Sequence, residues 1–417
     1  MAGGAGQREQ ARREVWNAFL GSAAQQGDPY ALLLGVPEDP GPLYAQLREK
    51  GPLYRSAIGT WVTGRHAVAG KILRDRRFGV RLTNGEKAPE AIEFDNSMLG
   101  QDPPNHTRLR KLAAPTFNPR RMEKWRSRVE EYVDELIDRI LAKGGKFNFM
   151  TAFAQQLPVR VVSELLGIPE QYWRSAFRLT RRMAHLMDGD ASPEVADDVL
   201  QAIDESARVF GEIVVLVREN PGENMISDLL PALDDGTLSL DELIALCTFL
   251  ILAGVETTVN LIGNATATLL GHSEQWAMFK DDVSLAPGVV QETLRYETPV
   301  QQYRRIVQED LELGGVFLPA DTELAICAGA ANRDPEAYHD PDRFDITRST
   351  TRRGEPEVLS FSMGMHFCLG ATLARIEAEV AMTAVAKRLP DLRQVAPVRR
   401  RNSYIVRGML QFPVAAA

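Results

Sequence analysis

Residues 361–370, FSMGMHFCLG, form a loop that presents Cys368 just before an amphipathic helix predicted over residues 371–389. Backbone N–H groups and the dipole at a helix N-terminus favour negative charge, so this position is expected to lower the pKa of the Cys368 thiol. A thiolate is a strong electron-donating axial ligand for a haem iron. Gly364 and Gly370 would let the loop turn sharply and approach a flat macrocycle. A lone cysteine is otherwise more often a small buried apolar residue, so the hypothesis needs support from other motifs.

A long predicted helix carries the second group of candidate residues. Ser239 and Glu242 have the spacing of a capping box, and the helix that they begin is predicted to run to about residue 271, a length of about 50 Å. Near its middle, the sequence AGVETT places Gly254, Glu256 and Thr257 directly after an apolar run. A mid-helix glycine costs about 1 kcal/mol relative to alanine, which indicates a need for space. The alternative is that Gly254 permits close helix packing while Glu256 and Thr257 face a solvated groove.

Two further residue pairs have helical spacing. Glu292 and Arg295 lie three residues apart on a helix predicted over residues 286–296, and His106 and Arg110 lie four residues apart after a proline-rich turn. Each pair therefore shares one helix face. Such pairs are common on protein surfaces, where an ion pair of this spacing contributes only about 0.2–0.5 kcal/mol.

In chain order, these motifs resemble those of the cytochrome P-450 family, in particular its soluble bacterial members, over about residues 43–406. The resemblance implies a haem b cofactor whose iron takes the Cys368 thiolate as its axial ligand. It also implies that Glu256 and Thr257 lie over the distal face of the haem, where Thr257 hydrogen-bonds dioxygen or a water and Glu256 helps to relay protons. The residues expected to bind the cofactor are His106, Arg110, Ala253, Gly254, Arg305, Phe361, His366, Cys368 and Gly370.

The resemblance assigns narrower roles to some of these residues. It places the haem propionates beside His106, Arg110, Arg305 and His366, with Arg304 as the alternative to its neighbour Arg305.

It also implies a buried charge network with a structural role and no direct part in the chemistry. The members expected from the family pattern are Glu292, Arg295 and Arg343. Ser362 stands where the family usually has glycine, which is expected to alter the packing beneath the iron.

Composition limits the class of protein. The 417 residues include 48 basic and 56 acidic side chains, a formal net charge of −8, which argues against nucleic-acid binding. Three scattered cysteines suggest neither a disulfide framework nor a zinc site, and a reducing cytoplasm is expected. The N-terminal sequence has no uninterrupted apolar core, and the most apolar run, over residues 244–255, is shorter than the roughly twenty residues needed to span a bilayer. We therefore expect no membrane association.

The expected fold class is mainly α with small β-sheets, in which a long central helix lies over the haem and the cysteine loop lies beneath it. Residues 1–417 are expected to form a single cytochrome P-450 domain, with a β-rich N-terminal part over about residues 43–100 and a helical body over about 105–299. A mixed C-terminal part is expected over about residues 300–417. Strands are predicted at residues 53–57, 60–63 and 322–328, with a hairpin at 311–318, and loops at 189–193, 219–223 and 234–236.

Substrate contacts are expected from segments 84–99, 183–187, 246–250, 300–303 and 404–406. Most of these segments are apolar, which suits a bulky lipophilic molecule. The candidate side chains are Leu246, Leu250, Val300, Gln301, Tyr404 and Ile405. The resemblance implies hydroxylation or epoxidation of a bacterial secondary metabolite, such as a macrolide or another polyketide.

Electrons are expected from a ferredoxin and its NAD(P)H-dependent reductase, because the chain has no flavin fingerprint and no cysteine cluster. A basic docking patch is expected at Lys111, Arg120, Arg121 and Arg375. Two alternatives remain open. One is a haem-thiolate enzyme with a non-insertion reaction, such as a peroxygenase, an oxidative coupling or a rearrangement. The other is a helical scaffold without a cofactor.

Overall fold

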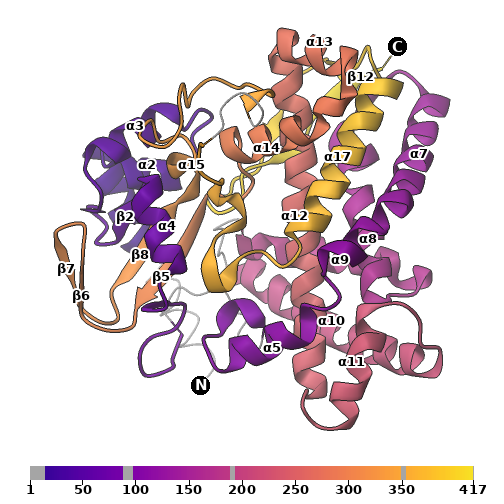
Figure 1. Cartoon of the computed structure of the whole chain (residues 1–417), viewed down its shortest axis with the longest axis horizontal. Helices are drawn as coiled ribbons and strands as arrows, with labels where there is room; N and C mark the ends of the chain where they lie inside the picture. The colour runs from indigo at the N-terminus through magenta and orange to yellow at the C-terminus, as the bar shows by residue number, and fades with distance from the viewer. Residues whose placement is uncertain (1–14, 88–96, 188–192, 349–353, 417) are drawn as a thin grey trace.

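The computed structural model describes residues 15–87, 97–187, 193–348 and 354–416. Its helices form a large body, and a small sheet covered by N-terminal helices lies beside it (Figure 1). The N-terminal elements are α2 (Pro29–Leu34), α3 (Gly41–Glu49), β1 (Tyr54–Arg55), β2 (Trp61–Thr63), α4 (His66–Arg74), β3 (Phe78–Gly79) and η1 (Met98–Gly100). The predicted fold class, mainly α with small sheets, is confirmed.

The helical body follows the predicted periodicity. Its elements are α5 (Asn105–Ala113), α6 (Pro119–Glu123), α7 (Trp125–Lys143), β4 (Lys146–Asn148), η2 (Met150–Ala154), α8 (Gln156–Leu166), α9 (Glu170–Met183), η3 (Ala184–Met187), α10 (Pro193–Glu219), α11 (Met225–Asp234), α12 (Leu240–Gly271), α13 (Ser273–Asp281), η4 (Val283–Leu285) and α14 (Ala286–Tyr296). The loops predicted at residues 219–223 and 234–236 separate α10, α11 and α12. Of the loop predicted at 189–193, residues 189–192 lie outside the described part of the chain.

The C-terminal part mixes short strands and helices, as predicted. Its elements are β5 (Gln302–Val307), β6 (Leu311–Leu313), β7 (Val316–Leu318), β8 (Glu323–Cys327), α15 (Ala328–Ala331), η5 (Leu359–Phe361), η6 (Gly364–His366), α17 (Ala371–Arg388), β9 (Arg393–Gln394), β10 (Arg399–Arg400), β11 (Met409–Gln411) and β12 (Pro413–Ala415). The predicted hairpin is present, because β6 pairs with β7 in antiparallel register.

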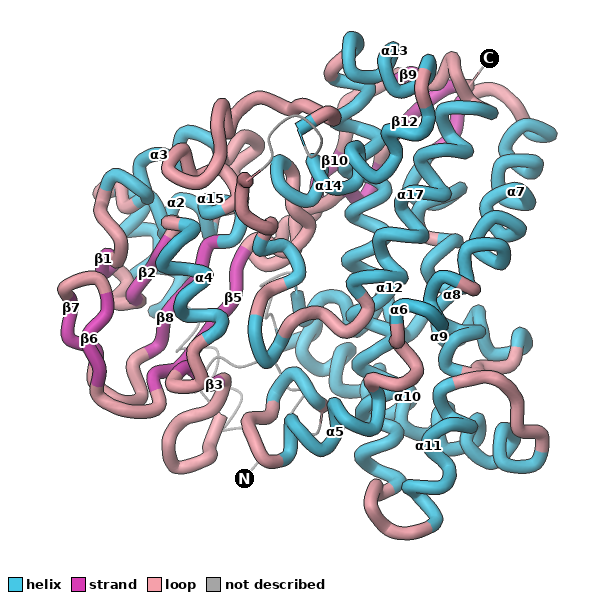
Figure 2. The backbone as a smooth tube through the Cα atoms, viewed as in Figure 1, coloured by secondary structure: helices cyan, strands magenta, loops and turns pink. Residues whose placement is uncertain are grey.

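The main sheet joins strands that are far apart in the sequence. Its order is β1-β2-β8-β5-β3, so strands from the first eighty residues flank two strands from residues 302–327 (Figure 2). The prediction of a β-rich N-terminal part was wrong, because the described residues of this part contain more helix than strand. In the described residues of that part, α3 and α4 are longer than the two- and three-residue strands, which acquire most of their pairing from β5 and β8.

Helix α12 runs through the centre of the helical body (Figure 1). The predicted capping box is present: the Ser239 side chain accepts from the Glu242 N–H, and the Glu242 carboxylate accepts from the Ser239 N–H. By length and composition, this 32-residue helix could cross a membrane, with a mean hydropathy of 1.8 over its most apolar 18 residues. The twelve-residue run underestimated this length, because further apolar residues such as Val259, Leu261 and Ile262 follow it. In the fold, α12 packs against α8, α10, α14 and α17 as a core helix.

Helix α17, which follows the cysteine loop, contains a buried acid. Glu377 is 1 % exposed, and its Oε2 has no hydrogen-bond partner among the described residues. Burial raises the pKa of this carboxyl well above its usual value. A carboxyl without a cationic partner in an apolar core is more stable in its neutral form.

We expect Glu377→Gln to change the pH dependence of stability. Above about pH 4.5, unfolding exposes a carboxyl that ionises, so unfolding releases a proton and the wild-type stability contains a contribution that falls as pH rises. Glutamine has no such proton. The stability of the variant relative to wild type, measured by urea unfolding, should therefore increase from about pH 5 to about pH 8. Glu130→Gln, at an exposed position of α7, is the control, and a flat difference for Glu377→Gln would contradict a neutral buried acid.

Candidate functional site

The cysteine loop is held in a fixed shape by its own backbone. The N–H of Cys368 donates to the Phe361 carbonyl at 2.9 Å, and the N–H of Phe367 donates to the Gly364 carbonyl at 3.1 Å. Gly364 has φ +66°, and a Cβ there would lie 2.4 Å from the Leu73 carbonyl oxygen of α4. Only glycine fits this position, so the loop packs directly on α4. Gly370 caps α17 with an ordinary negative φ, so its backbone does not require glycine.

Cys368 is partly buried and lies three residues before the first residue of α17. Burial raises the pKa of its thiol, while the Gly370 N–H and the charges of Arg110 and Arg375 act to lower it. The sequence predicted a lowered pKa for Cys368, and this prediction was wrong for the chain without a bound metal. The desolvation of the thiol raises its pKa more than the helix terminus and the two guanidinium groups lower it. Metal coordination deprotonates a thiol directly and does not need a thiolate to form first.

Ser362 occupies a backbone conformation that favours glycine. Its φ is +59°, a left-handed conformation that costs about 1 kcal/mol or more for other residues. Its hydroxyl accepts a hydrogen bond from Arg305 Nη2 at 3.4 Å, and its N–H donates to the Tyr303 hydroxyl at 3.1 Å. The departure from the family pattern at this position thus adds a contact between the loop and β5.

A group of buried cationic or imidazole side chains lies next to the loop. The rings of His106 on α5 and His366 in the loop have centroids 4.4 Å apart. Both ring nitrogens of His106, and Nε2 of His366, are buried without a hydrogen-bond partner among the described residues. Arg305 is 5 % exposed, and its Nη1 donates to the Arg304 carbonyl. Unpaired buried nitrogens are costly, so this group requires an acceptor.

The pKa values in this group show that the site disfavours positive charge, mainly because its members are buried. Burial, followed by the charges of Arg305, His106 and Arg110, lowers the pKa of His366 to about 2. Burial and the charge of Arg110 lower the pKa of His106, and burial lowers the pKa of Arg305 to about 10. An anion placed among these groups would accept their hydrogen bonds and offset their repulsion. The carboxylates of haem propionates fit that requirement.

The choice between Arg304 and Arg305 follows from their positions on β5. Arg304 pairs with Glu323 of β8 at 3.2 Å, and its side chain is 33 % exposed. Arg305 points to the opposite side of the strand, toward the loop and the two histidines. Arg305, and not Arg304, therefore lies on the side of the strand that faces the cysteine loop. Arg110, also expected there, donates to the Phe367 carbonyl at 2.7 Å at the base of the loop.

One face of α12 is open within the core. Ala253, Gly254 and Thr257 are only partly buried, whereas Leu252, Val255 and Glu256 between them are buried. Thr257 Oγ1 donates to the Ala253 carbonyl at 2.7 Å. A Cβ at Gly254 would lie 3.1 Å from Val162 of α8, so Gly254 permits close helix packing, the alternative left open by the sequence. Because α8 fills the space at Gly254, the open face of α12 consists of Ala253 and Thr257.

Glu256 forms a buried ion pair. Its Oε2 accepts from Arg401 Nη1 at 2.5 Å, and both residues are less than 10 % exposed. Sequence reasoning missed Arg401. It lies 145 residues along the chain in a segment without regular structure, and no local pattern links the two residues.

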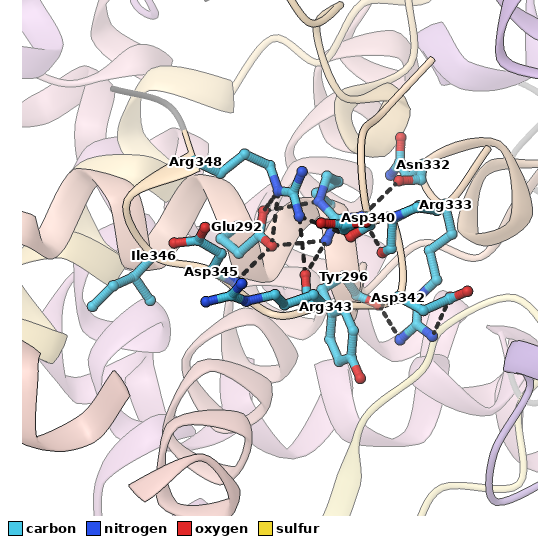
Figure 3. A network of polar contacts seen from close by, with 12 residues as sticks. Glu292, Tyr296, Asn332, Arg333, Asp340, Asp342, Arg343, Asp345, Ile346 and Arg348 are labelled. Carbon is cyan, nitrogen blue, oxygen red and sulfur yellow. Dashed lines mark hydrogen bonds and ion pairs between the residues drawn. The ribbon is translucent and has the colours of Figure 1, made fainter. Parts of the chain in front are cut away.

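The Glu292 network is present, but with a different third member (Figure 3). Arg295 donates to both carboxylate oxygens of Glu292, at 2.8 and 2.7 Å, and Arg348 Nε approaches the same oxygens at 3.1 and 3.2 Å. The prediction of Arg343 was wrong: it contributes only its main-chain carbonyl, which accepts from Arg295 and Arg348, while its side chain is exposed. Phe344, Ile346 and Arg348 are buried at every second position, which places Arg343 on the outer side of this segment. The sequence prediction did not use this alternation.

The predicted substrate residues divide into two groups. Leu246 and Leu250 are buried on α12, and Val300 bridges to Val406 beside the partly buried Ile405. Gln301 was wrong as a substrate contact, because its side chain bonds to the Tyr44 hydroxyl and to the Thr298 carbonyl.

Gln301 and Tyr404 instead line a small cavity of about 40 Å³ with Tyr30 and Tyr44. The predicted wall at 84–99 falls partly on residues 88–96, which lie outside the described part of the chain.

Comparisons with known proteins agree with this geometry. A family model described as cytochrome P450 matches residues 266–389. The 6-deoxyerythronolide B hydroxylase of Saccharopolyspora erythraea is 40% identical, covering 89% of this chain and 94% of that protein. The cytochrome P450 monooxygenase PikC of Streptomyces venezuelae is 39% identical, covering 85% of each. The solved structure of the Bacillus subtilis bacillaene polyketide synthase cytochrome P450 PksS has a TM-score of 0.81 at 32% identity, covering 91% of this chain and 97% of that one.

We expect Arg348→Ala to lower the free energy of unfolding by about 3–5 kcal/mol, because it leaves the buried Glu292 carboxylate with one guanidinium fewer. Arg343→Ala is the matched control: it removes an exposed side chain and keeps the carbonyl, so its effect should be within about 0.5 kcal/mol. Denaturant unfolding of the two variants measures the difference. Equal losses would show that the side chain of Arg343 also belongs to the network.

Proposed function

Because this chain belongs to the cytochrome P450 family, we propose that it is a haem-thiolate monooxygenase that hydroxylates or epoxidises a bulky lipophilic molecule with dioxygen. The observation that carries the proposal is that the loop of Cys368 also carries His366, which lies against His106, and that both histidines have buried nitrogens without a partner among the described residues. A thiol ligand and a nearby group of imidazole and guanidinium side chains match the iron and the propionates of one haem in chemical type.

The residues present fit haem b in chemical type. Cys368 would provide the axial ligand, and the propionates would be held by His106, His366, Arg305 and Arg110. When bound, haem supplies the iron chemistry that activates dioxygen and transfers one oxygen atom to an organic substrate. The protein supplies position, a dry environment and protons.

Thr257 and Glu256 are the proposed proton-handling residues. The Thr257 hydroxyl donates to Ala253 and keeps its lone pairs, so Oγ1 can accept a hydrogen bond from a water on the open face of α12. Glu256 is the adjacent acid, and its carboxylate is held by Arg401 at the buried edge of the same helix turn. An alcohol and an acid at neighbouring positions can hand protons along a short water chain. This favours a dioxygen-dependent reaction over a peroxygenase or a rearrangement.

The proposed substrate class rests on the apolar side chains near α12 and on the relatives. Leu246, Leu250, Val300 and Ile405 are apolar, which suits a bulky lipophilic molecule. The names of two relatives refer to a polyketide synthase and to the hydroxylation of 6-deoxyerythronolide B. We therefore propose a macrolide or another polyketide of bacterial secondary metabolism as the substrate.

A ferredoxin, reduced by an NAD(P)H-dependent reductase, is the proposed electron donor, and the cytoplasm is the proposed location. The structure narrows the docking patch expected from the sequence. Lys111 and Arg120 are exposed, but Arg121 pairs with Asp228 and Arg375 stacks over the Phe361 ring at 4.5 Å. Lys111 and Arg120 are therefore the members available to an acidic partner.

The reduced, carbon-monoxide-bound absorption spectrum tests the thiolate ligand. We expect the haem-loaded wild-type protein to show a strongly red-shifted Soret band, and Cys368→Ser to lose it, because a neutral hydroxyl donates less electron density to the iron. Cys327→Ala is the control, since Cys327 is buried in β8, and should keep the band. An unchanged band in Cys368→Ser would refute the proposed ligand.

A further inference from the structure

Three buried polar side chains form a stripe along α12. Glu256, Asn260 and Asn264 follow one another at four-residue spacing, so they share one helix face. This stripe lies next to the row formed by Ala253 and Thr257 on the same helix. All three residues contact the segment 401–408, which precedes β11.

The contacts of this stripe are specific. Glu256 pairs with Arg401, and Asn264 Nδ2 donates to the Arg407 carbonyl at 3.0 Å. Asn260 lies so close to Gly408 that a Cβ there would be 1.8 Å from its Oδ1. The segment 401–408 is therefore fixed on α12 at three successive turns, and Glu256 is the contact nearest to Thr257.

Arg401 also reaches a third element. While Nη1 binds Glu256, Nη2 donates to the Ala184 carbonyl at 3.0 Å, where α9 ends and η3 begins. Its own N–H donates to the Gly408 carbonyl at 3.1 Å. The planar guanidinium thus spans two acceptors on two elements, a geometry that the single ammonium of lysine does not reproduce.

A buried ion pair is weak evidence for stability alone, because apolar residues of similar size often replace one without loss. Here the pair places a carboxylate one residue before Thr257 and fixes its direction. We propose that Arg401 is a positioning residue that acts through Glu256: it holds the proton-relay acid in place and couples that position to the end of α9. This inference rests on the proposed function, because it assigns Glu256 to proton delivery.

The test uses the haem-loaded full chain and two readouts. The first is amide hydrogen exchange over residues 184–187, which reports the coupling to α9 without any turnover. The second is the solvent deuterium isotope effect on oxygen consumption, driven by a surrogate plant-type ferredoxin and its reductase without an organic substrate. The variants are Arg401→Gln, Arg401→Lys, Glu256→Gln and the double glutamine variant. Arg399→Gln is the matched control, because Arg399 is an exposed arginine of the adjacent β10.

We expect Arg401→Gln to speed exchange over residues 184–187 by roughly tenfold or more, since a buried hydrogen bond to a charged group is lost. It should also slow oxygen consumption by roughly tenfold or more and enlarge the isotope effect, as Glu256→Gln does. The double variant should be no slower than either single variant, because both residues act in one unit. Arg401→Lys should recover part of the oxygen consumption that Arg401→Gln loses, but amide hydrogen exchange over residues 184–187 should remain fast.

Three outcomes are distinguishable. Oxygen consumption in Arg401→Gln that matches Arg399→Gln, with an unchanged isotope effect, would overturn the positioning role while leaving the proposed monooxygenase intact. Effects that add in the double variant would also overturn it. A wild-type protein that consumes no oxygen would contradict the proposed function, while hydrogen exchange would still decide whether Arg401 couples α12 to α9. If Arg401→Gln does not fold, Arg401→Lys and Glu256→Gln supply the same comparisons.

Discussion

The unpaired buried nitrogens of His106 and His366, together with the buried guanidinium of Arg305, form the constraint around which the site is built. Such groups are stable inside a protein only when an acceptor satisfies them. Several local features bring the side chains of His106, His366 and Arg305 together. The loop reaches Arg305 through the left-handed Ser362, it packs on α4 through Gly364, and it carries His366 to within ring contact of His106. In the proposed function, an anionic cofactor would complete this arrangement and Cys368 would bind its metal.

A second set of polar contacts holds the opposite side of the site. The stripe on α12 fixes the segment 401–408, which carries the partly buried Ile405. The Glu292 network ties α14 to residues 340–348 and keeps the polypeptide that leads to the loop in position. Both arrangements use buried charges whose partners come from distant parts of the chain. The reactive groups are therefore oriented by residues that need not touch the cofactor.

The sequence predicted the features that depend on interactions between residues close together in the chain. The capping box at Ser239, the bounds of α14 and the shared face of His106 and Arg110 on α5 depend on neighbours a few residues away. Contacts between distant segments could not be found in this way. The pairing of β2 with β8 and the bond between Arg401 and Glu256 join residues far apart in the chain. Arg343 was predicted from the family pattern alone, which does not show which side of the segment is buried.

In the proposed function, the sulfur of Cys368 binds the iron of a haem whose carboxylates lie beside His106, His366 and Arg305. X-ray absorption at the iron edge of the haem-loaded protein measures that bond. We expect one sulfur atom in the first coordination shell of iron in the wild-type protein, and its replacement by a lighter atom in Cys368→Ser. A wild-type spectrum that contains only nitrogen or oxygen ligands would contradict it.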